Sequence, residues 1–290
     1  MRRAVRRFFD TLQGTRKYLF FIGLTAICIV ALCLGIYAQF FYKYSDTDAL
    51  MIGINIGSKK NAEEIDALKS DFNNLFTNTI VGENENPGID RLKTENTKLV
   101  FTAYNLVNED ENYYSVNAQI PMLNINSEKA KEINAEIKSD FYDLANSVMR
   151  RNEGTTIYTV SYAAFINKDI VSIVIKSSLK EEGKSEKVCV KTYNYSMAEE
   201  RLLPLTDLIE LKETTVESVQ NTIDTDIKKA YNNAKIIAAE FGNLYERDLS
   251  SDIYKVENTS TFFLTQDGYV YIVYAYGNND YTNEMDVIIF

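Results

Sequence analysis

The sequence predicts an α+β fold in which antiparallel sheets are covered by two long helices and preceded by one N-terminal transmembrane helix. Three observations lead to this prediction: an uncharged apolar run near the N-terminus, two long segments with apolar residues three and four positions apart, and several segments that alternate apolar and polar residues between short turns. With 290 residues, 46% of them hydrophobic, the chain is long and apolar enough to form a sizeable core.

The N-terminal run is "YLFFIGLTAICIVALCLGIYAQFFY", residues 18–42, and it contains no charged residue. A helix rises ~1.5 Å per residue, so this run is long enough to cross the ~30 Å hydrocarbon layer of a bilayer. Residues 1–17 hold six basic residues and one acidic residue, which predicts a cytoplasmic basic tail, with the bulk of the chain outside the cell membrane. A signal peptide cleaved near Ala38 is the alternative, but signal peptides have shorter apolar cores.

Residues 43–97 are predicted to form a juxtamembrane helix followed by a linker. Asn61 and Glu64 have the spacing of a helix cap, and apolar residues recur at helical spacing after them. The polar stretch "VGENENPGIDRLKTENT" then predicts the linker, because Pro87 and Gly88 interrupt regular structure.

Residues 98–200 are predicted to form a first α+β domain. Its expected elements are a strand pair at 98–107 and 113–123, a helix at 127–150, and an antiparallel meander of strands at 157–166, 170–179 and 187–195. The stripe of the helix that we expect to face the core comprises Ala130, Ile133, Ile137, Phe141, Leu144 and Val148.

Residues 201–290 are predicted to form a second α+β domain. A helix is expected from about Lys212 into the 230s, and it is followed by strands at 261–264, 269–276 and 285–290 that form a closing hairpin. The stripe of this helix that we expect to face the core comprises Val216, Val219, Ile223, Ile227 and Ala230.

Several phrases resemble a known bacterial arrangement of two extracytoplasmic domains of unknown function. "YSVNAQIPML", "EINAEIKSDF" and "YTVSYAAFINKDIVSIVI" resemble the domain that precedes the catalytic part of some peptidoglycan deacetylases. "KTYNYSMAEERLLPLTDLI" and "FFLTQDGYVYIVYAYG" with "DVIIF" resemble the companion domain. The pair is similar to the ectodomain of lysozyme-sensing anti-sigma factors, over roughly residues 100–290. The resemblance implies an extracytoplasmic module of the cell envelope that recognises peptidoglycan or a lysozyme-like protein.

The chain departs from both the deacetylases and the anti-sigma factors in the segment that would carry out catalysis or bind a sigma factor. It has no histidine, so it lacks the metal site of a deacetylase catalytic module, and 17 residues before the membrane run are fewer than an anti-sigma factor uses to hold its sigma factor. The absence of histidine also excludes Ser-His-Asp and Cys-His catalysis. We therefore predict no catalytic residues, no cofactor and no enzymatic activity, with a carboxylate-dependent cell-wall hydrolase as the alternative.

The run "GNNDYTNEMD" contains the weak candidates for a metal site. Asn278, Asp280, Glu284 and Asp286 offer oxygen ligands suited to calcium, but they lack the spacing of an EF-hand loop. Asn and Asp are also frequent in turns, so we expect this run chiefly to return the last strand to the sheet. The cysteines, Cys28, Cys33 and Cys189, do not suggest a disulfide within the body, and Cys189 is expected to be a small strand residue.

Charge narrows the class of partner. From Asp46 onward the chain has 24 basic and 40 acidic residues, a net charge of −16. Such a body repels phosphate backbones, so nucleic acid is excluded as a partner, whereas a cationic protein fits the charge. We expect a non-enzymatic binding or sensory module for wall glycan or a cationic wall-active protein. A structural partner in a membrane complex is a further alternative, and the sequence predicts no oligomeric state.

Overall fold

The computed structural model describes residues 56–241, 245–277 and 283–290. The chain divides into two compact units, residues 1–65 and 66–290. The predicted basic tail and membrane helix, residues 1–42, lie outside the described residues. Within the described part, no helix is both long enough and apolar enough to cross a membrane. The membrane helix therefore stays a prediction.

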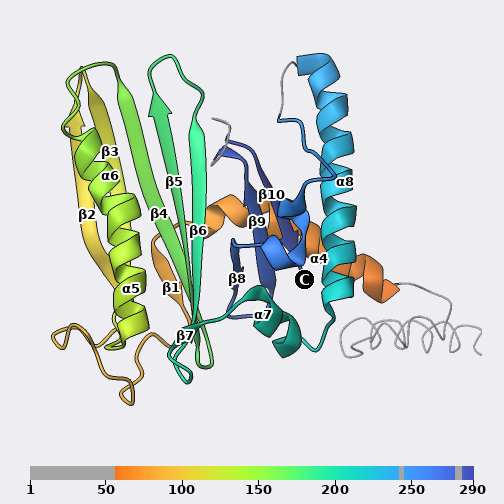
Figure 1. Ribbon diagram of the computed structural model, residues 1–290, viewed down its shortest axis with the longest axis horizontal. Helices are drawn as coiled ribbons and strands as arrows, with labels where there is room; N and C mark the ends of the chain where they lie inside the picture. Colours follow the sequence, from red (N-terminus) through yellow and green to blue (C-terminus); the bar gives the residue numbers. More distant parts are fainter. Residues whose placement is uncertain (1–55, 242–244, 278–282) are drawn as a thin grey trace, which may run out of the picture. The chain divides into compact units, whose positions relative to one another are not determined.

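A large sheet of seven strands forms the first half of the residue 66–290 unit (Figure 1). Six strands follow one another in the order β2-β3-β4-β5-β6-β7, and β1 lies beside β4. The strands are β1 (Thr79–Val81), β2 (Val100–Asp110), β3 (Tyr114–Leu123), β4 (Thr156–Asn167), β5 (Ile170–Glu181), β6 (Lys187–Ser196) and β7 (Arg201–Leu202). The predicted strand pair and meander are confirmed: β2 pairs antiparallel with β3, β4 with β5, and β5 with β6, each through a short turn.

The sequence predicts an antiparallel sheet, but two of the strand pairings in the large sheet are parallel. Strand β4 pairs parallel with β3 over its first half and parallel with β1 at Ala163–Phe165. The β3–β4 pairing follows from the helix between the two strands, because a helical crossover returns the chain in its original direction. The strand β1 lies in the region that we had assigned to the helix and linker. Of the polar stretch that we assigned to the linker, only its first residue, Val81, belongs to this strand.

One face of the large sheet is covered by a long helical segment (Figure 1). It consists of α5 (Glu128–Ile137), a π-helical turn (Lys138–Tyr142) and α6 (Asp143–Val148). The Ser127 hydroxyl caps α5 by accepting a hydrogen bond from the Ala130 amide at 3.1 Å. The apolar residues between this face and the helices form the first core. The predicted stripe is confirmed: Leu144 is half-buried and packs against the first core, the other five residues are buried, and Ala145 is buried beside them.

A second core lies around a three-stranded antiparallel sheet. Its order is β10-β9-β8, with β8 (Phe262–Leu264), β9 (Val270–Ala275) and β10 (Met285–Ile289). The helices α7 (Leu205–Leu211) and α8 (Val216–Phe241) contribute side chains to this core. The predicted strands and helix are confirmed, and Val219, Ile223 and Ile227 are buried. Val216 is 49% exposed, because it is the first residue of α8 and precedes the part of the helix that meets the core.

Strand β8 meets the face of the large sheet that α5 and α6 do not cover. Ile173 and Tyr193 belong to the first core, so the alternation of side chains points Ser172, Thr192 and Asn194 to the opposite face. There they bond the backbone edge of β8 that does not pair with β9. Phe262 N–H donates to Thr192 Oγ1 at 3.0 Å, Leu264 N–H donates to Ser172 Oγ at 3.2 Å, and Asn194 Nδ2 donates to Phe262 O at 2.8 Å.

The Asn194 amide is the centre of this junction. It also accepts a hydrogen bond from Ser172 Oγ at 2.7 Å, and both side chains are fully or almost fully buried. The network therefore satisfies polar groups that water cannot reach. We call the side chains of Ser172, Thr192 and Asn194, together with the edge of β8 that they bond, the junction.

Replacing Asn194 by Ala is expected to lower the free energy of unfolding by about 2–4 kcal/mol, because Ser172 and the Phe262 carbonyl would be left buried without this partner. Denaturant unfolding followed by circular dichroism measures the change. Asn117, which is exposed on β3, is the control, and its replacement by Ala is expected to change stability by less than about 0.5 kcal/mol. Equal effects of the two substitutions would show that the junction does not matter for stability.

Candidate functional site

The described carboxylates of the predicted metal loop bind an arginine. Asn278 and Asp280 lie outside the described residues, whereas Glu284 and Asp286 flank the start of β10. The guanidinium of Arg247 contacts both carboxylate oxygens of Asp286, through Nε at 2.6 Å and Nη2 at 2.9 Å, and it lies 3.4 Å from Glu284. Arg247 is only 7% exposed. These two carboxylates therefore neutralise a buried cation of the protein itself.

Three tyrosines surround this ion pair. Tyr276 donates its hydroxyl hydrogen to Asp286 Oδ2 at 2.6 Å, so Tyr254 is the donor in the 2.8 Å contact between the Tyr254 and Tyr276 hydroxyls. Tyr245 stacks on the Tyr276 ring with centroids 4.2 Å apart, and the Arg247 guanidinium lies 5.2 Å from the same ring. The Tyr245 amide also donates to Glu284 at 2.5 Å. The segment after α8 is thus fixed to the start of the last strand.

The ionisation of the cluster follows from this geometry. Burial lowers the pKa of Arg247, but the hydrogen bond and charge of Asp286 outweigh burial and leave the pKa above its ordinary value. Burial, followed by the negative charge of Asp286, raises the pKa of Tyr276. Burial likewise raises the pKa of Tyr254 to about 12. At neutral pH the Arg247 guanidinium is charged and the Tyr254 and Tyr276 phenols are neutral, which suits structural pairing.

The described residues contain no cluster of side chains suited to hold a metal ion, and their one cysteine is not activated as a nucleophile. In that part of the chain, no group of three or more Cys, Asp or Glu side chains is placed to hold a metal ion. Cys189 is half-buried on β6, and burial raises the pKa of its thiol. A thiol with a raised pKa is a poor nucleophile because less of it is thiolate.

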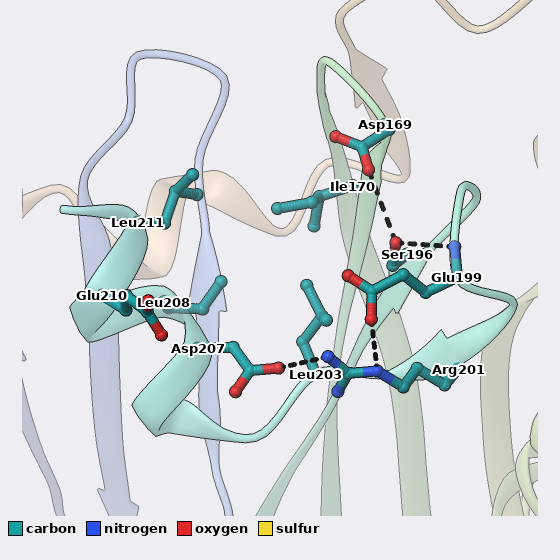
Figure 2. Close-up of a pocket in the computed structure, with 10 residues that line it drawn as sticks. All are labelled: Asp169, Ile170, Ser196, Glu199, Arg201, Leu203, Asp207, Leu208, Glu210 and Leu211. Carbon is teal, nitrogen blue, oxygen red and sulfur yellow. Dashed lines mark hydrogen bonds and ion pairs between the residues drawn. The ribbon is translucent and has the colours of Figure 1, made fainter.

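A surface pocket of about 370 Å³ lies where the β4–β5 turn, the end of β6, β7 and α7 meet (Figure 2). Its apolar residues include Ile170, Leu203 and Leu208, all of which are buried. The carboxylates that line it are those of Asp169, Glu199, Asp207 and Glu210, and the one cation in its lining is Arg201. The pocket combines an apolar base with an excess of negative charge.

Arg201 lies between two of these carboxylates, as Figure 2 shows. Its Nε is 2.6 Å from Glu199 and its Nη2 is 2.7 Å from Asp207. The hydrogen bond to Asp207, followed by that to Glu199, raises the pKa of Arg201. The Ser196 hydroxyl, at the end of β6, donates to the Asp169 carboxylate at 3.4 Å and accepts from the Glu199 backbone amide at 3.2 Å. Arg201 neutralises part of the acidic charge, and the rest can attract a cationic group.

Comparisons with known proteins identify no family for this chain. No family model matches it, and no curated protein matches it. The chain is similar to a solved DUF3298 family protein from Pseudomonas aeruginosa, with 14% identity and a TM-score of 0.36, over 71% of this chain and 91% of the other. It is also similar to a DUF3298 family member from Bacteroides fragilis, with 12% identity and a TM-score of 0.31, over 61% and 81% of the two chains. Both TM-scores are low, so neither likeness decides the fold or the function of this chain.

Sequence reasoning singled out neither Arg247 nor the pocket around Arg201. Arg247 is one charged residue in a polar stretch, and its partner Asp286 is 39 positions away. The residues of the pocket are spread from Asp169 to Leu211 without any motif spacing. The acidic composition of the chain indicated a cationic partner, but it did not show which residues would form the binding site.

Replacing Arg247 by Ala is expected to cost about 3–5 kcal/mol of stability, because it leaves the nearly buried carboxylate of Asp286 without its cation. Thermal and denaturant unfolding measure the loss. Arg150, which is exposed after α6, serves as the control, and its replacement by Ala is expected to have almost no effect. A loss below about 1 kcal/mol for the Arg247 variant would contradict the assignment of a structural ion pair.

Alkaline pH is expected to destabilise the protein. Burial raises the pKa of Tyr254 and of Tyr271 to about 12, from an ordinary value of 10.0. The folded state therefore keeps protons that the unfolded chain loses, so this stability is complete below pH 10 and is lost as the pH rises from 10 to about 12. Denaturant unfolding across this range, with tyrosinate absorbance, tests the expectation. The loss should be smaller in the Tyr254→Phe variant, and stability that stays constant up to pH 12 would contradict it.

Proposed function

We propose that this chain is a non-enzymatic binding module of a bacterial cell envelope that recognises a cationic partner through its acidic surface. The observation that carries the proposal is the pocket beside α7, where four carboxylates and one guanidinium surround an apolar base. A lysine or arginine side chain of a partner fits such a pocket, because its aliphatic stem can pack on Leu211, which is 48% exposed, while its charge meets the carboxylates.

Two further features support this class of partner. From Asp46 onward the chain carries a net charge of −16, which accelerates encounters with a basic protein and disfavours nucleic acid. The resemblance of residues 100–290 to envelope domains that recognise lysozyme or precede deacetylases suggests a wall-active basic protein as the partner. Wall glycan is the competing ligand.

The proposed location follows from the N-terminal sequence. Residues 18–42 would hold the chain in the cell membrane, with residues 1–17 in the cytoplasm and the bulk of the chain outside. In this arrangement the acidic pocket faces the space where cationic wall-active proteins act. The module binds without catalysis, and it requires no cofactor.

The proposal is tested by binding of the purified full chain to lysozyme as the cationic probe, in parallel with insoluble peptidoglycan. We expect saturable binding to lysozyme that weakens as salt rises, because exposed charges are screened beyond about 8 Å at physiological ionic strength. The Glu199→Gln, Glu210→Gln double variant should lower the association rate at least about threefold, because the pocket loses two negative charges. The control is Glu132→Gln, an exposed change on α5.

Three outcomes would overturn the proposal. Retention on peptidoglycan without binding to lysozyme would identify glycan as the ligand. Equal effects of the pocket and α5 substitutions would place recognition elsewhere on the acidic surface. Release of soluble sugar from peptidoglycan by the chain would establish a hydrolase.

A further inference from the structure

Residues 69–82, which we call the strap, contact three separate elements within the 66–290 unit. At one end, Lys69 Nζ lies 2.6 Å from Asp226 Oδ2 on α8. In the middle, Phe72 packs against the three-stranded sheet. At the other end, β1 pairs with β4 of the large sheet. One short segment therefore contacts the elements of both cores.

Phe72 occupies the contact region between the two sheets. Its ring centroid lies 6.5 Å from that of Phe263 and 6.4 Å from that of Tyr271. Phe263 in turn stacks on Phe165 of the large sheet, with centroids 5.6 Å apart. Phe72 is 2% exposed, yet it belongs to neither the first nor the second core. It closes an aromatic stack that lies between the cores.

The rest of the strap is held by shallow contacts. Strand β1 has three residues, of which Thr79 and Val81 are exposed. Asn78, with φ of 59°, precedes it and exchanges hydrogen bonds with Tyr162 of β4, its amide at 2.8 Å and its side chain at 3.0 Å. Lys176 reaches from β5 to Asn73 at 2.8 Å. Phe72 is the one fully buried side chain of the strap, and Ile80 of β1 is half-buried and packs against the first core, so a small number of side chains oppose release of the strap.

The end of β1 requires a glycine. Gly82 has φ of +110°, and a Cβ at this position would lie 2.4 Å from the carbonyl oxygen of Ile166. Any larger residue would push β1 away from β4. Phe72 and Gly82 are thus two separate positions at which a substitution can weaken the attachment of the strap.

We propose that the strap is a conformational device: it detaches from the two sheets as a unit, and its release loosens the contact between the cores while each core stays folded. Release uncovers Phe263 and Tyr271, which are almost fully buried, and frees the edge of β4 at Ala163–Phe165. The chain that precedes the strap leads to the predicted membrane helix. It stands apart from the proposed binding function and does not depend on the pocket beside α7.

Hydrogen exchange on the full chain tests the device, using two variants that act at these two positions, Phe72→Ala and Gly82→Ala. We expect both to speed exchange of the amides at 72–82 and 262–264 by at least about tenfold. The amides of α5 and of the first half of α8 should keep their wild-type protection. The matched control is Phe141→Ala, the same chemical change at a residue of the first core that is also 2% exposed. It should speed exchange throughout α5.

Two results would overturn the proposal. If either strap variant speeds exchange in α5 and α8 by the same factor as in the strap, then the strap and the cores open together as one cooperative unit. If the strap amides keep their protection in both variants, these two positions do not hold it. Phe72→Leu, a milder change, distinguishes these results if Phe72→Ala does not fold.

Discussion

The arrangement of the two sheets depends on one unusual set of hydrogen bonds. An edge strand normally pairs with another strand or faces water, but the outer edge of β8 is bonded by the side chains of Thr192, Asn194 and Ser172. These side chains project from the face of the large sheet, so they fix where β8 sits on that face. The aromatic stack of Phe165 and Phe263 fills the space beside them. The positions of β9, β10 and the buried Arg247 then follow from the position of β8.

Much of the fold could be predicted because each element carries its own periodic pattern. Ile133 and Ile137 on one helix, and Ile223 and Ile227 on the other, recur at helical spacing and are buried as expected. The errors have physical causes that a local pattern does not contain. Strand β1, for example, has only three residues, too few to show alternation. The junction was missed because Ser172 and Asn194 look like ordinary polar residues on an exposed face.

The candidate sites were harder to predict than the fold, since each depends on contacts across long stretches of chain. The sequence drew attention to Glu284 and Asp286 as oxygen ligands, and the structure pairs both with Arg247, nearly forty positions earlier. A run of acidic residues cannot reveal whether its counter-ion is a bound metal or a distant guanidinium. The pocket around Arg201 is built from four neighbouring elements, and only their folding brings Asp169 and Asp207 into the lining of one pocket.

The sequence separation of the strap contacts also sets an order of events when the protein is made. Thr79 leaves the ribosome long before its partner Ala163, and Phe72 leaves still longer before Phe263 and Tyr271. Strand β1 therefore gains its partner β4 when little more than half of the chain has been made, whereas Phe72 remains without its aromatic partners until almost the entire chain has been synthesised. A side chain produced early is among the last to dock, so its attachment marks the completion of the folded unit.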